Sequence, residues 1–487
     1  MGKMQNTAVG LMFALTAVGC SHQAIEAEND AAHPKHAKVK SLKFSGTGRW
    51  FQFGQAPNPD LPWPPFELKT YAAELNFDTA SSVVKLTRSQ IIEAGRNRPE
   101  PVAQRVEQYL NAKTAWNIAA TGNAPAATTP QPTAIEERAA EIWSTPQGFL
   151  QAVLANPSST EDAADGSKLV SFTLEGKYKY QGKLNAKHEL ENVKTWIDNP
   201  VLGDTLIETQ YSEYKDFAGI QFPAHIVRIQ GGFPVLDLKV DSVAVNTDVG
   251  VPPPPAEAKV PAIQVKAEQL ADGVYYLTGG THHSVAIAQK DHIVLVEAPQ
   301  NEARSEAVIN KLKEIIPNKP IKYLINTHAH FDHSGGLRTF VDAGATIITE
   351  SANQAYYQKI WQAPHTLNPD KLSQSHKAAN IDSFTHKYVL SDGKRKIELH
   401  SIAGNSHNDA FILVYLPKEK ILIEADAYTP LAANAPLPSK ANPYAVNLDE
   451  NIQKLKLKVD KIAALHGPNV VTLADLKTYI GKAATAK

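Results

Sequence analysis

Residues 326–336 read NTHAHFDHSGG and crowd four metal-type ligands together: His328, His330, Asp332 and His333. His328 and His330 are two positions apart, so their side chains point the same way in an extended segment. The other two follow in a turn, where the paired glycines permit tight backbone. Imidazoles and carboxylates suit zinc or iron. We therefore interpret the stretch as a metal-ligating segment rather than a chance cluster on a polar loop.

The sequence around this stretch alternates between strand and helix patterns. Residues 302–316 place Val308 and Leu312 on one helical face. Short apolar runs read as strands, and two late segments read as helices. The expected strands are 273–279, 284–289, 292–299, 321–327, 345–350, 411–417 and 420–426, and the late helices are 448–458 and 473–483. Alternating strands and helices predict a layered α/β domain.

Three further residues can complete a metal site. His407 lies in a polar loop just before a strand, Asp426 ends an apolar strand, and His466 precedes a Gly-Pro turn. A single loop histidine is more often simply solvated. Each of the three lies at the end of an expected strand or beside a turn. Together, in this order, they indicate a metal site more strongly than any one of them does alone.

The full set of His328, His330, Asp332, His333, His407, Asp426 and His466 resembles the metallo-β-lactamase superfamily, over residues 266–480. The resemblance implies a four-layer αβ/βα sandwich with metals at one edge. It implies one metal held by the ligands His328, His330 and His407. It implies a second held by Asp332, His333 and His466. Asp426 would bridge them, and Glu297, where the prototype has aspartate, would support the site without contacting metal.

The ligand set favours two zinc ions, with iron as an alternative. A pair of zinc ions can share a water and lower its pKa, giving a metal-bound hydroxide, and Asp332 can orient it and move a proton. The expected activity is hydrolysis of a small ester, lactone, thioester or β-lactam-type bond. His282 and His283, in a turn near the metal edge, either touch substrate or form a surface turn, and His365 is placed at the rim of the cleft.

Length, composition and net charge limit the classes of protein to which the chain can belong. The chain has 487 residues, 43% hydrophobic and 20% charged, with a formal net charge of −1. This suits a globular protein of two or three domains and gives no electrostatic footprint for nucleic acid. The expected partner is a small-molecule substrate, and the oligomeric state is unreadable. A single cysteine, Cys20, leaves no thiolate for a metal site.

The first residues predict export. An apolar run from Ala8 to Val18 is short for a membrane span and fits a signal peptide over 1–20. Its end, Ala17 to Cys20, resembles the lipobox of bacterial lipoproteins, in which the cysteine is lipidated. A plain signal peptide or an uncleaved anchor stays open. We expect residues 21–38 to be a flexible tether, lipid on Cys20 to be the membrane attachment, and the location to be periplasmic or outer-membrane.

Residues 39–248 predict a separate, mainly antiparallel β domain. Alternating segments carry β-branched and aromatic residues between turn signals, and two helices are expected, around 98–112 and 134–154. The layout is loosely similar to periplasmic lipoprotein-carrier folds. Four consecutive prolines mark 249–262 as a semi-rigid linker, and 263–487 is the metal domain.

Two other functions remain open. An envelope lipoprotein could bind or carry an apolar ligand through residues 39–248. A related enzyme could use one iron to oxidise persulfides, although His333 and His466, which the resemblance assigns to a second metal, argue for two ions.

Overall fold

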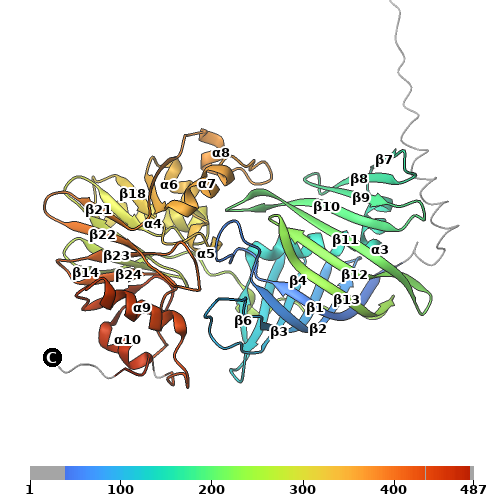
Figure 1. The fold of residues 1–487 in the computed structure, drawn as a ribbon. Helices are drawn as coiled ribbons and strands as arrows, with labels where there is room; N and C mark the ends of the chain where they lie inside the picture. The colour runs from blue at the N-terminus through green and yellow to red at the C-terminus, as the bar shows by residue number, and fades with distance from the viewer. Residues whose placement is uncertain (1–38, 434, 483–487) are drawn as a thin grey trace, which may run out of the picture.

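The computed structural model describes residues 39–433 and 435–482. The predicted signal peptide and tether lie outside these residues. Within the described part of the chain, no helix has the length and apolarity needed to cross a membrane. Two lobes lie side by side in Figure 1, with the N-terminal half in blue to green and the C-terminal half in yellow to red.

The N-terminal lobe is built on one 13-stranded sheet in which every neighbouring pair is antiparallel. Its order is β6-β5-β4-β3-β2-β1-β13-β12-β11-β10-β9-β8-β7. The strands are β1 Ser41–Phe51, β2 Pro65–Asn76, β3 Ser81–Gln90, β4 Gln104–Asn111, β5 Thr114–Thr121, β6 Ala127–Pro130, β7 Ser158–Asp162, β8 Lys168–Leu174, β9 Tyr178–Leu184, β10 Leu190–Asn199, β11 Gly203–Phe217, β12 Ile220–Gln230 and β13 Phe233–Val245.

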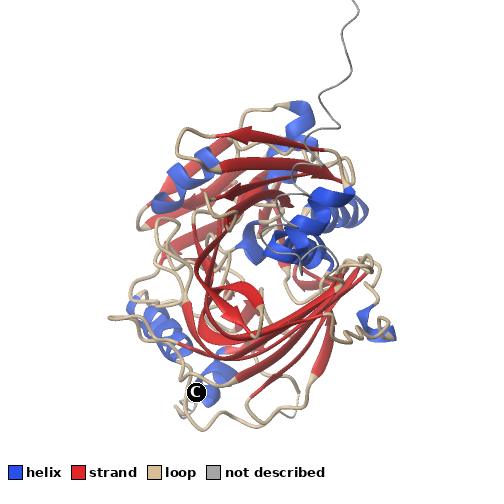
Figure 2. Cartoon of the chain, turned by 90° about the vertical axis from the view of Figure 1, so that its right-hand side faces the viewer, coloured by secondary structure: helices blue, strands red, loops and turns tan. Residues whose placement is uncertain are grey.

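Two helices pack against this sheet: α2 Ile135–Ser144 and α3 Pro146–Ala155, after the short turn η1 Pro132–Ala134. Their apolar residues Ile142 and Phe149 share one buried core with strands from both halves of the sheet, which curves strongly in Figure 2. Thr145 ends α2 and caps α3, because its side chain accepts a hydrogen bond from the Gly148 amide.

The helix expected around 98–112 is wrong. Residues 104–111 form β4, which pairs with β3 on one side and β5 on the other. Val106 and Leu110 are buried, as are three of their four cross-strand partners, Leu86, Ser82 and Ala115. Cross-strand pairing and burial override the helical propensity of the Gln, Glu and Leu residues in this segment.

The C-terminal lobe contains two sheets. The first has order β14-β15-β16-β17-β18-β19-β20, antiparallel up to β17 and parallel from there. The second has order β21-β22-β23-β24-β25-β26. Their strands are β14 Lys266–Ala271, β15 Val274–Thr278, β16 Ser284–Ala288, β17 Ile293–Val296, β18 Ile321–Ile325, β19 Thr346–Glu350, β20 Asn380–Phe384, β21 Lys387–Ser391, β22 Lys396–Ser401, β23 Ile412–Leu416, β24 Ile421–Glu424, β25 Lys461–Ala464 and β26 Val471–Thr472.

Helices cover the outer faces of both sheets. On the first sheet, Val308 and Phe340 pack with Leu295 and Ile347 in one cluster. On the second, Leu448 and Leu476 join the core of its strands. The helices are α4 Glu302–Ile315, α5 Phe331–Ser334, α6 Leu337–Asp342, α7 Ser351–Ile360, α8 Lys371–Ser375, α9 Pro443–Lys454 and α10 Leu473–Tyr479, with the turn η2 Ala256–Ala258 before β14.

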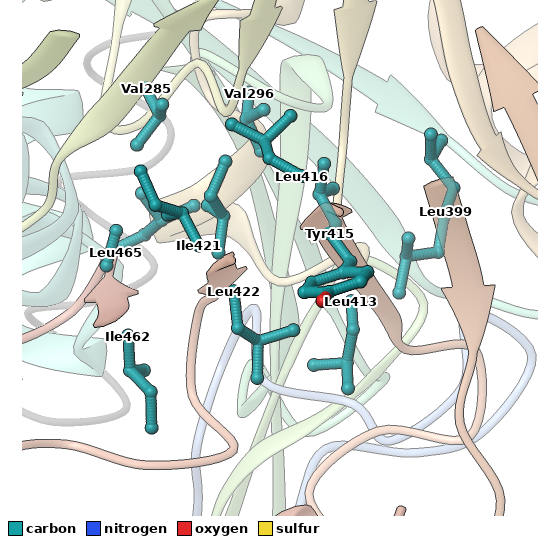
Figure 3. Close-up of a cluster of buried hydrophobic side chains, with 14 of the residues drawn as sticks. Val285, Val296, Leu399, Leu413, Tyr415, Leu416, Ile421, Leu422, Ile462 and Leu465 are labelled. Carbon is teal, nitrogen blue, oxygen red and sulfur yellow. The ribbon is translucent and has the colours of Figure 1, made fainter. Parts of the chain in front are cut away.

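The main core lies between the two sheets. Figure 3 shows Val285 and Val296 of the first sheet beside Leu416 and Ile421 of the second. All four are fully buried, and full burial of each such side chain contributes about 1.5–3 kcal/mol. The result is a helix–sheet–sheet–helix sandwich, which confirms the predicted layered α/β fold.

Candidate metal site

The histidine-rich stretch follows β18 directly. After Ile325 five residues outside any strand or helix lead to the one-turn helix α5, which begins at Phe331, and His330 just before it has an extended backbone. His328, His330 and His333 are all at most 2% exposed. The strand therefore delivers three imidazoles into the interior of the fold, where a polar group needs a partner.

Three ring nitrogens at this point have no hydrogen-bond partner. They are Nε2 of His328, Nδ1 of His330 and Nε2 of His407, and all are buried. With a carboxylate oxygen of Asp426 they form a group whose ligand atoms all lie within 4.8 Å of one another. Buried polar atoms are nearly always hydrogen-bonded, so three orphaned imidazole nitrogens converging on a carboxylate fit a divalent metal.

Asp426 lies at the centre of the cluster. Its Oδ2 is 3.0 Å from His407 Nε2, 3.1 Å from His333 Nε2 and 3.6 Å from His328 Nε2. Its Oδ1 is 2.9 Å from His466 Nδ1. This carboxylate faces four imidazoles with both oxygens and belongs to both groups of candidate ligand atoms that contain a carboxylate, which is where the family resemblance would put a bridging ligand.

A second group of ligand atoms adjoins the first. His333 belongs to one set with Asp332 and Asp426, and to another with His282 and His466. The family resemblance implied Asp332, His333 and His466 for this position, and the structure places His282 beside His333 and His466. The His282 ring stacks on that of His466 at 4.1 Å, and its Nε2 lies 3.2 Å from Asp332 Oδ2.

His282 is buried and forms a β-bridge with His466, so the surface-turn alternative is wrong for it. His283 has a structural role: its amide and its Nε2 bond the carbonyls of Leu465 and Gly467. The doubled histidine between two strands was the available sequence signal, but it did not say which ring faces the site.

Glu297 supports the site from behind. Its Oε2 lies 3.1 Å from His333 Nδ1, and its Oε1 accepts the amide of Thr327 at 2.6 Å. The first contact leaves His333 Nε2 facing Asp426. This is the position expected for Glu297: it orients a ligand and belongs to none of the candidate ligand groups.

The electrostatics follow from burial and mutual contact. Burial lowers the pKa of His328 to about 3, aided by the nearby His333. Burial also disfavours the charged form of His333, but Asp426 and Asp332 outweigh it and raise its pKa well above the usual value. Burial would raise the pKa of Asp426, yet the charge of His333 and the close contacts with the His333, His328 and His407 rings hold it well below its usual range. The metal-free cluster is thus charged at Asp426, neutral at His328 and protonated at His333, so a metal ion that binds His333 must displace its proton.

His365 is buried away from these groups. Its ring lies against Gly203 of the N-terminal lobe, and it lines a cavity of about 430 Å³ with Arg338 and Asp370. It stands at the junction of the two lobes, so the structure does not bring it together with the seven candidate ligands.

Residues 277–462 match the family model described as Metallo-beta-lactamase superfamily. A curated relative, metallo-beta-lactamase type 2 from Elizabethkingia meningoseptica, is 25% identical over 170 residues, which is 33% of this chain. The match spans 61% of that relative's length. Residues 277–462, within the C-terminal lobe, thus match the metallo-β-lactamase superfamily, and the match does not reach the 13-stranded sheet.

Solved structures are also similar to part of this chain. A metallo-beta-lactamase from Pontibacter korlensis has 18% identity and a TM-score of 0.34, covering 45% of this chain and 98% of that one. One from Hirschia baltica has 18% identity and a TM-score of 0.34, covering 45% and 97%. The DIM-1 metallo-beta-lactamase has 16% identity and a TM-score of 0.34, covering 45% and 96%.

Proposed function

We propose that the protein is a metal-dependent hydrolase that cleaves a small ester, lactone, thioester or β-lactam-type bond. The observation that carries the proposal is the set of three buried, unbonded imidazole nitrogens around Asp426. His328, His330 and His407 would hold one ion, with Asp426 between it and a second ion. Histidine and carboxylate ligands without cysteine suit zinc.

Metal ions held there would polarise the substrate oxygen and lower the pKa of water. The chain's own residues would then position and move the proton. Asp332 is suited to this because its side chain is 32% exposed, whereas the Asp426 side chain is 8% exposed. Its carboxylate can orient a water at the mouth of the site and accept a proton from it. His282, buried behind Asp332, would hold one of its oxygens.

The first experiment measures metal content per chain on the purified protein. The test variant carries Asp332→Ala with His407→Ala, and the matched control carries Asp60→Ala with His386→Ala, two exposed positions. Two zinc ions in the wild type and the control, and fewer in the test variant, are expected. A broad panel of esters, lactones, thioesters and β-lactams then tests activity, and cleavage of none of them by the zinc-loaded protein would reject the hydrolase.

The same measurement tests the iron alternative. One iron per chain would indicate persulfide oxidation instead of hydrolysis. The group formed by His282, His333 and His466 beside the first one favours two ions.

The N-terminal lobe gives little support to the alternative that the protein binds or carries an apolar ligand. That lobe has a cavity of about 280 Å³, and its lining includes Glu137, Arg138, Glu141 and Arg228. Four charged side chains suit a polar occupant better than an apolar one. Export and a lipid on Cys20 remain proposals that rest on residues 1–20, and mass measurement of the membrane-extracted protein would test the lipid.

A further inference from the structure

One loop of the N-terminal lobe lies directly on the histidine-rich stretch. The loop joins β1 to β2, and four consecutive residues, 54–57, each contact the C-terminal lobe. The Gly54 carbonyl accepts the Phe331 amide at 3.1 Å, and the Pro57 carbonyl accepts the Asp409 amide at 2.8 Å. Between them, Gln55 and Ala56 contact the candidate ligands themselves.

An aromatic cluster fixes the loop in place. The Phe331 ring, which stands between His330 and Asp332 in sequence, lies 5.2 Å from Phe53 and 5.8 Å from Trp63. Both contacts are edge-on, the favoured geometry for aromatic pairs. Gly54 has φ +78°, and a side chain there would come within 2.8 Å of the Phe331 ring. Glycine therefore permits both the turn and the close approach.

Ala56 determines which nitrogen of His330 faces the site. The His330 Nε2 lies 3.0 Å from the Ala56 carbonyl oxygen, which can only accept a hydrogen bond. Nε2 must therefore carry the proton, and Nδ1 is left as a lone-pair donor. Nδ1 is the buried nitrogen without a partner that converges on Asp426.

Gln55 forms a hydrogen bond with Asp332, the candidate proton acceptor. Its side-chain Nε2 donates to Asp332 Oδ1 at 2.8 Å, while His282 Nε2 lies 3.2 Å from Oδ2. The two contacts fix the plane of a carboxylate that is otherwise partly exposed to solvent. Gln55 comes from the N-terminal lobe and His282 from the C-terminal lobe, so the Asp332 carboxylate is held from both lobes.

A second loop of the N-terminal lobe braces the segment that carries His407. Arg96 makes a two-pronged contact with Asp409 at 2.9 and 3.0 Å, and the Asn97 amide donates to Ser406 Oγ at 2.9 Å. The bracing therefore reaches two separate ligand segments, one around residue 330 and one around residue 407.

We propose that the N-terminal lobe is a working part of the metal site, with Gln55 and the Ala56 carbonyl as positioning groups for Asp332 and His330. The proposal rests on the proposed function only in that both require metal to bind at this cluster. Partners of ligands typically affect metal affinity by about 10–100-fold. The chain thus uses a domain outside the superfamily fold to supply part of the shell around the metal.

The test compares Gln55→Met with Gln52→Met in the full chain. Methionine keeps the length of the side chain and removes the donor. Gln52 lies in the same loop, and among the described residues its hydrogen bonds are made by its backbone, from its amide to the Pro64 carbonyl and from the Gln55 amide to its carbonyl. Zinc affinity is measured by competition with a chromophoric chelator, and the visible spectrum of the Co²⁺-loaded protein reports ligand geometry. The Gln55 variant should bind the weaker ion about 10–100-fold less tightly with an altered spectrum, and the control should match the wild type.

Equal affinity and an equal spectrum in the Gln55 variant would overturn the positioning role. A second measurement needs no metal: hydrogen exchange of the Phe331 and Asp409 amides in the metal-free wild type. Protection of both supports docking of the loop, and exchange at the rate of exposed amides overturns it. If the wild type binds no metal, the proposed function fails, and the exchange result alone then decides whether the loop holds the cluster.

Discussion

Replacing Glu297 with glutamine isolates the contribution of the residue behind the site. Glu297 is fully buried and accepts from the Thr327 amide at 2.6 Å and from His333 Nδ1 at 3.1 Å, with one oxygen for each. Glutamine has nearly the same shape but only one acceptor oxygen. In the Glu297→Gln variant an N–H of the new amide must face one of these two donors.

The magnitude follows from that mismatch. A buried donor left without an acceptor costs about 1–3 kcal/mol. If the mismatch falls on His333, the ring is no longer held with Nε2 toward Asp426, and the cost appears as lost metal affinity. At 1.4 kcal/mol for each factor of ten, the expected loss is about 5- to 150-fold. If it falls on Thr327, the metal-free protein loses about 1–3 kcal/mol of unfolding free energy instead.

Chelator competition measures the first quantity and urea unfolding of the metal-free protein measures the second. Glu314→Gln, on the surface of α4 with a side chain that is 62% exposed, is the control and should change neither. A Glu297→Gln variant that matches the wild type in both assays would refute the role assigned to this carboxylate.

Three further predictions address pH, the second group and the core. Burial raises the pKa of Asp370, but the hydrogen bond from Arg338 outweighs it and lowers the value to about 2. Because the folded pKa lies below the unfolded value of about 3.9, Asp370 stabilises the fold above about pH 4 and loses this effect as the pH falls toward 2. Asp370→Asn should therefore cost about 1–2 kcal/mol in urea unfolding at pH 7, with a smaller difference at pH 3. His282→Ala should weaken the second zinc ion about tenfold or more in chelator competition while the first stays bound, and equal loss of both would contradict its placement in the second group. Phe411→Ala removes a buried ring stacked on His328 at 4.9 Å, so it should cost about 3–5 kcal/mol by urea unfolding, and a cost below about 1 kcal/mol would show that the ring is not part of a packed core.

In the C-terminal lobe, two features follow from the residue pattern over a few positions. His328 and His330 fall on one side of an extended segment by spacing alone, and that segment follows β18 as the sequence predicted. Strands of unbroken apolar residues such as β17 and β23 are buried throughout, so their pattern already marked the interior of a layered fold.

Prediction from the residue pattern gave the wrong element where helix propensity conflicts with strand pairing. Residues 104–111 contain good helix formers, yet they form β4 because β3 and β5 offer backbone partners on both sides. Residues 135–144 and 146–155 form helices because their apolar side chains pack onto the sheet and their backbones do not pair with a strand.

The sequence by itself determined the chemistry of the candidate ligands and the order of the main strands and helices in the C-terminal lobe, because both depend on residue type and on spacing over a few positions. Only the tertiary structure placed Asp426 among four imidazoles, chose His282 over His283, and brought Gln55 within 2.8 Å of Asp332, 277 positions away. Such contacts depend on how two lobes pack, and packing is set by side chains distributed over the whole chain. No local pattern around Gln55 could therefore have indicated its partner.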